Sequence, residues 1–291
     1  MVRKVDEKFR NQSPAARTCR RGASLCCRPR ALPPMLRLIT AASAAAALTI
    51  YALRRRRKPR YTLHYYDHCP FGHRVHILLH RFGIPYNKVI HGYGAGARPS
   101  ENGGEGYGEG PRALIGMKMC PILVGEGVPY PAGMSGLPES LEICSFLIAE
   151  HKLPVPCATG RGDVDKFIKE LRECSDLLCL TRNPKMPVAD WADPRDVSYY
   201  YFKKREHGLV PQSAAVEAEL MQKVNAKLTE LVPMLRGANS LNAWGYGMDD
   251  VLLYPWLRRL TMIKGIIYPP AVRAYMANTT DELCDYSEHA L

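Results

Sequence analysis

Apolar and polar residues follow two different periods near the start of the folded part, and the change of period predicts a strand followed by a helix. Residues 61–66 read Tyr-Thr-Leu-His-Tyr-Tyr, a run of aromatic and β-branched residues that is typical of a strand. Apolar residues then recur at helical spacing from Val75 to Phe82, and Pro70 suits the first position of that helix. This region therefore predicts a strand that ends at a helix N-terminus.

Strand and helix patterns continue to residue 151 and predict a small α/β domain over residues 61–151. Short apolar runs at 122–123 and 128–130 flank a glycine turn and predict a hairpin. An amphipathic helix is predicted to open at 138–140 and to end at His151. The predicted order is strand, helix, strand, helix, strand, hairpin strand and helix.

Helical periodicity dominates from Asp163 onward. A separate all-helical domain is therefore predicted over residues 162–291, after a proline-containing linker at 152–161. Asp249 or Asp250 suits the N-cap of its last predicted helix. The predicted helices cover residues 164–180, 196–206, 214–235 and 249–265. We interpret their apolar stripes as core faces without chemistry.

The basic charge of the chain is confined to its first 60 residues. The net charge is +12, but residues 1–60 contain 16 Lys or Arg and two acidic residues, whereas the remainder contains 24 basic and 26 acidic residues. A nearly neutral folded part lacks the electrostatic footprint that nucleic-acid binding requires. No nucleic-acid partner is expected. Residues 1–34 are predicted to be a disordered basic leader or a targeting signal.

Residues 35–60 are predicted to be a membrane anchor or a targeting segment. Residues 38–53 carry no charge and precede a dense basic cluster. This stretch is shorter than the ~20 residues that span a bilayer comfortably, so an organelle presequence explains the composition as well. The first alternative implies a membrane-anchored protein with its folded part in a reducing compartment. The second implies a mitochondrial or plastid protein after removal of the leader.

The ten cysteines are irregularly spaced and do not resemble the framework of a disulfide-rich secreted protein. Free thiols in a reducing compartment are therefore predicted. Cys144, Cys174 and Cys179 lie among apolar residues of predicted helices and are interpreted as core residues.

Several histidines gather around the first predicted helix. His73, His76 and His80 share nearly one face of it, and His64 and His68 precede it. A metal site can be imagined from this cluster, but positions on the helix surface and at the strand-helix junction are favoured. No metal is expected.

Cys69 is the candidate nucleophile, because it stands where the first strand gives way to the helix that begins at Pro70. The unpaired N–H groups and the positive end of the helix dipole stabilise a thiolate at such a position. We therefore expect a lowered pKa for this thiol, which suits the attacking and leaving group of disulfide exchange.

A glycine-rich segment follows the second predicted strand. Residues 92–110 contain eight glycines. The segment lacks the Gly-Lys-Ser/Thr ending of a phosphate-binding loop, so that function is rejected. A lid over the site is one interpretation, and a flexible, solvent-exposed loop is the favoured one.

The chain resembles the glutaredoxin-2 family in two regions. Residues 61–151, with Cys69-Pro-Phe, Cys120-Pro121 and Glu139-Ser140, are similar to the glutathione-binding domain of that family. The stretch from Met248, which reads Met-Asp-Asp-Val-Leu-Leu-Tyr-Pro-Trp, is similar to its helical domain. The resemblance covers residues 61 to 280. It implies an α/β thioredoxin-like N-terminal domain followed by an all-α C-terminal domain, which is the architecture of glutathione transferases.

The resemblance also implies glutathione as the co-substrate and assigns roles around the thiol. Cys69 would be the catalytic nucleophile, with Pro70 and Phe71 beside it in the glutathione site. Pro121 matches the position of a cis proline, which lets the backbone of Cys120 pair with the cysteinyl unit of glutathione like an added strand.

Glu139 and Ser140 match the family's pair at the start of the next helix. There the free N–H groups and a hydroxyl donate hydrogen bonds to the α-carboxylate of the γ-glutamyl unit, and the glutamate forms an ion pair with its ammonium group. Helix capping alone explains the pair as well, and the two uses are compatible. Arg74 is a weaker candidate that assists by its charge.

Gly72 departs from the family pattern, which often has a second cysteine there. The departure leaves a monothiol cycle, in which Cys69 takes glutathione from a glutathionylated protein and a second glutathione releases it. Cys120 faces the nucleophile in this fold and is a possible resolving thiol, which would restore a two-thiol cycle.

The predicted function is therefore that of a glutathione-dependent thiol-disulfide oxidoreductase acting on glutathionylated or disulfide substrates. Two alternatives remain. The Cys-Pro-Phe start also resembles omega-class glutathione transferases and dehydroascorbate reductases. The second alternative is a membrane-tethered binding module without turnover. Chloride intracellular channel proteins resemble this architecture and have a similar Cys-Pro-Phe-Ser motif.

Overall fold

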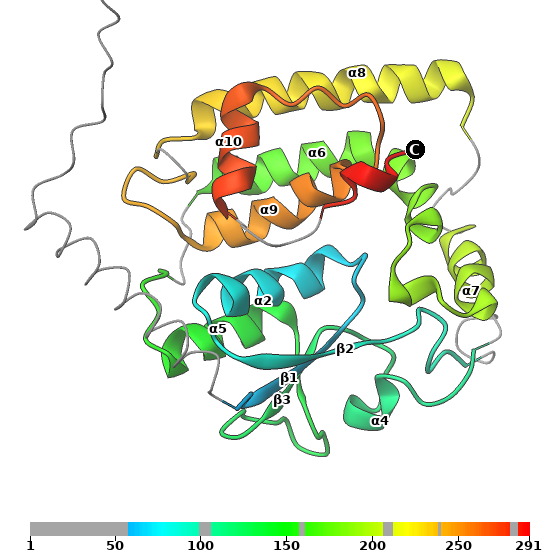
Figure 1. The fold of residues 1–291 in the computed structure, drawn as a ribbon, viewed down its shortest axis with the longest axis vertical. Coiled ribbons are helices and arrows are strands. Elements are labelled where there is room, and N and C mark those ends of the chain that lie inside the picture. Colours follow the sequence, from blue (N-terminus) through cyan, green and yellow to red (C-terminus); the bar gives the residue numbers. More distant parts are fainter. Residues whose placement is uncertain (1–57, 99–105, 157–160, 206–211, 238–239, 280–284) are drawn as a thin grey trace, which may run out of the picture. The chain divides into compact units, whose positions relative to one another are not determined.

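The computed structural model describes residues 58–98, 106–156, 161–205, 212–237, 240–279 and 285–291 (Figure 1). These residues all fall within one compact unit that begins at Tyr51. The predicted leader at 1–34 and the uncharged segment at 38–53 lie outside the described residues, so both stay predictions. Within the described part, no helix combines the length and the apolar character needed to cross a bilayer.

A four-stranded mixed sheet forms the first half of the unit. Its strands are β1 (Tyr61–Tyr65), β2 (Tyr86–Ile90), β3 (Ile122–Gly125) and β4 (Leu137–Pro138), in the order β2-β1-β3-β4. β1 pairs in parallel with β2 and antiparallel with β3. Alternate residues of β1 are buried, as the predicted period of two requires.

The predicted hairpin strand at 128–130 is wrong, because β3 pairs instead with Leu137–Pro138. The turn after β3 closes tightly through a hydrogen bond from the Val128 N–H to the Gly125 carbonyl. The Tyr130 hydroxyl then bonds both backbone groups of Gly125, which holds this segment beside the strand end without making it a strand. Chain reversal is therefore completed further along, at residue 137.

Helices α2 (Pro70–Arg81) and α5 (Ser140–Glu150) cover one face of the sheet, and the short helix α4 is Arg112–Ile115. α2 packs on both α5 and α9, so it lies between the sheet and the helical half (Figure 1). Because of this central position, the N-terminus of α2 lies at the boundary between the two halves, where the candidate site begins.

The second half is all helical, as predicted. Its longer helices are α6 (Gly162–Leu180), α7 (Pro194–Lys204), α8 (Ala214–Leu231), α9 (Met248–Leu260) and α10 (Pro270–Thr279), and its 3₁₀ turns are Asn183–Lys185, Ala189–Trp191, Val232–Met234 and Ser287–His289. α6, α8, α9 and α10 share one apolar core that contains Cys174 and Cys179, and Cys144 is buried under the sheet. The prediction that these three cysteines are core residues is confirmed. α10 was not predicted.

The predicted N-cap of α9, Asp249 or Asp250, is two or three residues too late. Gly247 is the N-cap, and Asp249 and Asp250 both lie in the first turn, where they are buried. The Asp250 carboxylate accepts the N–H groups of Gly247 and Leu241, each at 2.8 Å. The side chain therefore caps the helix from inside its first turn and also fastens the preceding loop.

The prediction that the histidines of α2 lie on its surface is wrong for two of them. His73 and His76 are 2% and 4% exposed. Both rings pack against Tyr65 of β1, and the His76 ring also packs against Tyr86 of β2. His68, at the predicted junction, is also buried.

The prediction of a flexible, solvent-exposed loop is wrong for the described ends of the glycine-rich segment. The Gly94 N–H and the Tyr107 hydroxyl both donate to Oδ1 of the buried Asp196, at 2.6 and 2.9 Å. The Tyr93 N–H donates to the carbonyl of Asp190. These bonds tie the segment after β2 to the 3₁₀ turn at Ala189–Trp191 and to α7. Residues 99–105 lie outside the described part.

Candidate active site

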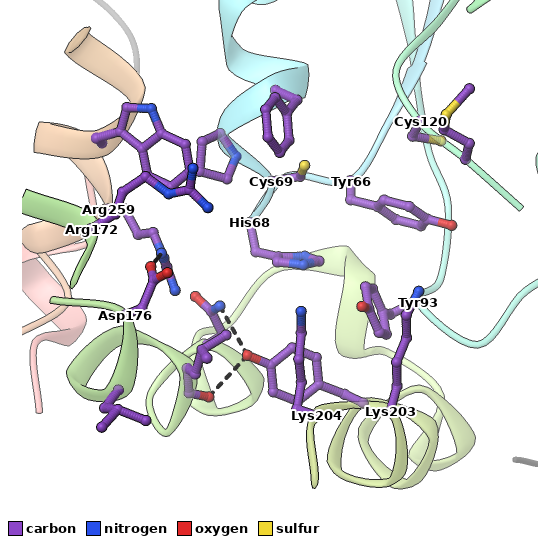
Figure 2. Close-up of a pocket in the computed structure, with 18 of the residues that line it drawn as sticks. Tyr66, His68, Cys69, Tyr93, Cys120, Arg172, Asp176, Lys203, Lys204 and Arg259 are labelled. Carbon is purple, nitrogen blue, oxygen red and sulfur yellow. Dashed lines mark hydrogen bonds and ion pairs between the residues drawn. The ribbon is translucent and has the colours of Figure 1, made fainter. Parts of the chain in front are cut away.

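A cavity of about 860 Å³ opens between the two halves of the unit. Residues of the first half line one wall, among them Cys69, Pro70, Phe71 and Cys120, and residues of α6, α7 and α9 line the other (Figure 2). The cavity thus contains four of the seven residues assigned to the site from sequence. Pro121, Glu139 and Ser140 lie outside its lining.

Cys69 is the N-cap of α2 and has extended backbone dihedrals, as a cap requires. Cys69 is a free cysteine, and the residue as a whole is partly exposed. The side chain makes no capping hydrogen bond, but the N–H groups of Phe71 and Gly72 at the helix N-terminus lower the pKa of the thiol.

The expected low pKa of Cys69 is wrong, because the pKa of this thiol is raised. Burial raises the pKa of the thiol, and the charge of Asp190 raises it further. The N–H groups of Phe71 and Gly72 and the charge of Arg259 lower the pKa, but they do not outweigh burial. The thiol at this site therefore needs a group that removes its proton.

The peptide bond between Cys120 and Pro121 is cis, as the resemblance implies. It brings the Cys120 side chain to the wall of the cavity, where burial raises the pKa of the thiol and Tyr66 makes a hydrogen bond with it. Cys69 and Cys120 are both free thiols on one cavity.

Lys118 lies next to these thiols inside a cage of tyrosine rings. Its Nζ is 4.4 Å from the ring centroid of Tyr93, 4.8 Å from that of Tyr199 and 5.1 Å from that of Tyr66. It also donates to the Tyr66 hydroxyl at 3.2 Å. Burial and then the charge of Lys203 lower its pKa to about 7, whereas the ring faces favour the ammonium form. Sequence reasoning did not single out this lysine.

Glu139 and Ser140 stand at the start of α5, where the sequence places them. Ser140 is buried, and its hydroxyl accepts a hydrogen bond from Arg74 Nη1 at 3.4 Å. The Arg74 guanidinium also lies 4.7 Å from the centroid of the Phe71 ring. Arg74 thus links the first turn of α2 to the start of α5, which joins the two groups of predicted binding residues.

Glu139 has a strained backbone, with φ of 70° and ψ of 115°. A non-glycine residue in such a region costs about 1–3 kcal/mol. We expect Glu139→Gly to raise the free energy of unfolding by about 1 kcal/mol, because glycine adopts this conformation without a Cβ penalty. Urea denaturation followed by circular dichroism measures the change.

The matched control for Glu139→Gly is Glu142→Gly. Glu142 is exposed in the first turn of α5 and has ordinary helical geometry. Glycine there should lower the free energy of unfolding by about 1 kcal/mol. If both variants lose stability, the backbone at Glu139 is not under strain in solution.

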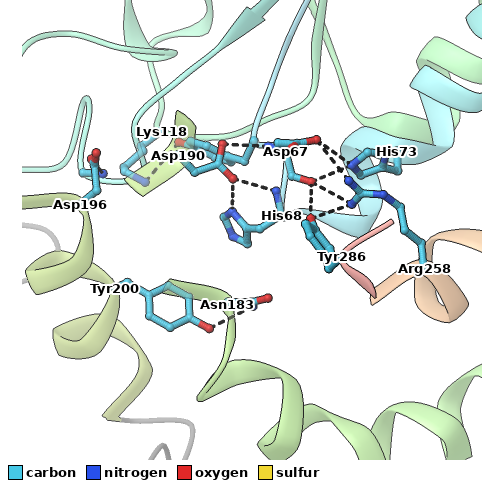
Figure 3. A network of polar contacts seen from close by, with 12 residues as sticks. Asp67, His68, His73, Lys118, Asn183, Asp190, Asp196, Tyr200, Arg258 and Tyr286 are labelled. Carbon is cyan, nitrogen blue, oxygen red and sulfur yellow. Dashed lines mark hydrogen bonds and ion pairs between the residues drawn. The ribbon is translucent and has the colours of Figure 1, made fainter. Parts of the chain in front are cut away.

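Asp190 and Asp67 fasten the loop that precedes Cys69 (Figure 3). The fully buried Asp190 carboxylate accepts the backbone N–H groups of Asp67 and His68, at 2.8 and 2.7 Å, and the His68 ring nitrogen Nδ1 at 2.6 Å. The Asp67 carbonyl accepts bonds from His73, Arg258 and Tyr286.

Charge supports the same network. Burial raises the pKa of Asp67, but the hydrogen bond from His73 and the charge of Arg258 hold it well below its usual range. The carboxylate is therefore ionised and lies 3.5 Å from Arg258 Nη2. Contacts from α9 and from the C-terminal segment thus reach the loop that precedes the thiol.

The helical wall of the cavity is cationic. Lys203 and Lys204 of α7 are half-buried in it, and burial lowers the pKa of both. Neither ammonium has a carboxylate within ion-pair distance among the residues that the structure describes. Arg172 of α6 lies 4.5 Å from the centroid of the Trp256 ring and adds a further cation. The same wall also contains Lys169, Arg259, Glu173 and Asp176, of which Arg259 and Asp176 form an ion pair. Sequence periodicity assigned these helices only core faces, so it missed this wall.

The described residues contain no group of three or more His, Cys, Asp or Glu side chains that could hold a metal ion. The histidines around α2 instead make hydrogen bonds and ring contacts within the fold.

Two family models match the chain in succession. The Glutathione S-transferase N-terminal domain model matches residues 68–150, and the Glutaredoxin 2 C-terminal domain model matches residues 163–283. Glutaredoxin 2 of Escherichia coli strain K12 is 24% identical over 218 residues, which cover 74% of this chain and 92% of that protein.

A solved structure of glutaredoxin 2 has the same fold. The crystal structure of glutaredoxin 2 from Salmonella typhimurium in complex with glutathione superposes with a TM-score of 0.66 at 23% identity, covering 80% of this chain and 100% of that one. Glutathione transferase Omega 3C from Trametes versicolor has a TM-score of 0.46 at 16% identity, covering 79% and 89%. The predicted fold class, a thioredoxin-like domain followed by a helical domain, is confirmed.

Proposed function

The chain belongs to the glutaredoxin 2 family, and from that premise we propose that it is a glutathione-dependent thiol-disulfide oxidoreductase whose nucleophile is Cys69. The observation that carries the proposal is the position of this thiol, which caps α2 and opens into the cavity between the two halves. Glutathione is the co-substrate. The family match favours this activity over the omega-class and non-enzymatic alternatives.

Glutathione fits along the path from Cys120 to the start of α5. The backbone of Cys120, turned by the cis bond to Pro121, is free to pair with the cysteinyl unit. The first turn of α5, with the Ser140 hydroxyl held by Arg74, supplies N–H groups for the γ-glutamyl carboxylate. Its ammonium group would meet the carboxylate of Glu139.

The reaction is two thiol-disulfide exchanges. In the first, the Cys69 thiolate attacks the glutathione sulfur of a glutathionylated protein, so that the old disulfide breaks and the protein leaves as a thiol after taking one proton. In the second, the thiolate of another glutathione attacks the bound glutathione sulfur. This step forms glutathione disulfide and returns Cys69 to its reduced state.

We propose a monothiol cycle because residue 72 is a glycine, so the motif has no second thiol. A side chain at this position would also require its neighbours to shift. A Cβ on the buried Gly72 would lie 3.1 Å from Cβ and 3.2 Å from Cδ2 of Tyr65, and Tyr65 is fully buried in β1. A disulfide between Cys69 and Cys120 stays a prediction. Mass mapping after mild oxidation tests it, and finding only glutathionylated Cys69 would exclude it.

The test of the proposed function is turnover of a glutathionylated peptide by the full chain, coupled to glutathione reductase so that oxidation of NADPH reports each cycle. We expect turnover that depends on both the peptide and glutathione. A chain that binds immobilised glutathione but shows no turnover would support the non-enzymatic alternative. Reduction of dehydroascorbate without reduction of the peptide would support the other alternative.

The cationic wall predicts a preference for anionic substrates. We expect the double variant Lys203→Gln/Lys204→Gln to raise KM for a glutathionylated acidic peptide by about tenfold, which corresponds to about 1.4 kcal/mol. The two half-buried ammonium groups attract carboxylates in a partly desolvated site. The difference from the parent should shrink at high salt, because exposed parts of the interaction are screened. Steady-state kinetics at two ionic strengths measures both effects.

Lys166→Gln is the matched control for the double variant. Lys166 lies on the outer face of α6, where its side chain is 76% exposed, and it does not line the cavity. An equal rise in KM for this control would mean that overall charge, rather than the cationic wall, sets the preference.

A further inference from the structure

His68 lies directly before the nucleophile and is held by a buried carboxylate. Its backbone N–H and its ring nitrogen Nδ1 both bond to Oδ2 of Asp190, at 2.7 and 2.6 Å. Asp190 is fully buried, and it also accepts the N–H of Asp67. Because a carboxylate oxygen accepts hydrogen bonds, Nδ1 carries the proton in this arrangement.

Aromatic rings fix the plane of the His68 imidazole. The ring centroid lies 4.6 Å from that of Trp191 and 5.1 Å from that of Tyr93, with Tyr66 and Tyr200 further out. Figure 2 shows the imidazole below the Cys69 sulfur, and both residues line the cavity. Asp190 and these rings together leave the imidazole little freedom to turn.

The second ring nitrogen of His68 is open to the cavity. Nε2 has no hydrogen-bond partner among the described residues, and it is not one of the buried unpaired atoms. The neighbouring histidines differ, because His73 uses Nε2 to bond Asp67 and both nitrogens of His76 are buried without a partner. His68 therefore presents one nitrogen to whatever occupies the cavity.

The chemistry of the site requires such a group. Burial raises the pKa of the Cys69 thiol, so a proton must leave it before attack, and the departing thiolate must gain one. The hydroxyls of Tyr66, Tyr93 and Tyr200 stay protonated, because burial raises the pKa of each. They cannot serve as the base near neutral pH.

We propose that His68 is the catalytic acid-base group of the exchange and that Asp190 is the residue that positions it, an inference that rests on the proposed function. His68 Nε2 takes the proton of Cys69. The thiolate attacks the glutathione sulfur, the disulfide breaks, and the imidazolium returns the proton to the departing protein thiolate. In the second exchange Nε2 takes the proton of the incoming glutathione and gives it to Cys69 as that thiolate leaves.

The test compares leaving groups of different acidity. The full chain and His68→Asn are assayed with two glutathione mixed disulfides, one carrying an alkyl peptide thiol and one carrying 2-nitro-5-thiobenzoate, an aromatic thiol that leaves without a proton. The asparagine amide can still donate to Asp190, so the loop keeps its bond. Iodoacetamide alkylation of Cys69, read by mass spectrometry, reports the thiolate population of each variant and normalises the rates.

We expect the normalised kcat/KM of His68→Asn to fall by about 10²-fold for the alkyl substrate and by less than about threefold for the aromatic one. His64→Asn is the control, because His64 stacks on His91 away from the cavity. Equal losses on both substrates for His68→Asn would overturn the proposal, since they would indicate a structural role.

Lys118 is the competing proton carrier, because it lines the same cavity. If Lys118→Met rather than His68→Asn produced the selective loss on the alkyl substrate, the assignment to His68 would also be overturned. Failure of the parent to turn over either substrate would refute the proposed function itself, which separates the two outcomes.

Discussion

Replacing Cys69 with serine is expected to abolish glutathione-dependent reduction of a glutathionylated peptide. The rate should fall by about 10⁴-fold or more, towards that of the uncatalysed exchange. Serine has nearly the size of cysteine and is a favoured N-cap residue, so the fold should survive. Its hydroxyl is not ionised near neutral pH and forms no stable bond to a disulfide sulfur. The coupled glutathione reductase assay measures the loss.

Cys174→Ala is the matched control for Cys69→Ser. Cys174 is buried in the helical core, where its thiol donates to the Leu171 carbonyl, and it lies outside the lining of the cavity. This variant should keep its turnover. Activity that persists in Cys69→Ser would assign the reaction to another thiol, and Cys120 would then be the first candidate.

Replacing Asp190 with alanine is expected to lower the free energy of unfolding by about 4 kcal/mol. The substitution leaves the N–H groups of Asp67 and His68 and the His68 ring nitrogen without their acceptor in a buried place, and each buried unpaired donor costs about 1–3 kcal/mol. Water that enters the space recovers part of this loss. Urea denaturation measures the change in midpoint.

Asp193→Ala is the matched control for Asp190→Ala. Asp193 is the N-cap of α7 and pairs with Arg195, but its side chain is 29% exposed. Loss of such a cap costs about 1 kcal/mol. If the two variants unfold at the same urea concentration, the buried carboxylate does not fasten the loop before Cys69 in the way we describe.

The parts of the site that lie within short stretches of chain could be predicted from the sequence. Cys69 stands at a strand-helix junction, and the pairs Cys120-Pro121 and Glu139-Ser140 each belong to one turn. The junction at Cys69 follows from the local pattern of residues, whereas the two pairs were assigned from the resemblance to the glutaredoxin-2 family. The structure bears out their positions, and their roles in binding stay proposals.

The parts that could not be predicted depend on contacts between distant residues. The orientation of His68 depends on its hydrogen bonds to Asp190, which lies 122 residues further along the chain. The pKa of Cys69 likewise depends on how deeply the two halves bury it, and the helix N-terminus alone suggested the opposite shift. Lys203 and Lys204 line the cavity because α7 packs there, and nothing in their periodicity indicates it.

The network around Asp67 has a consequence for how the protein unfolds. Arg258 of α9 donates a hydrogen bond to the Asp67 carbonyl and forms an ion pair with the Asp67 carboxylate. The Tyr286 hydroxyl, near the C-terminus, donates to the same carbonyl. Met248 and Val251 of α9 belong to the apolar core of the first half. Melting of α9 would therefore strip the first half of both its apolar cover and the partners of a buried charge. The two halves should lose structure in a single cooperative transition.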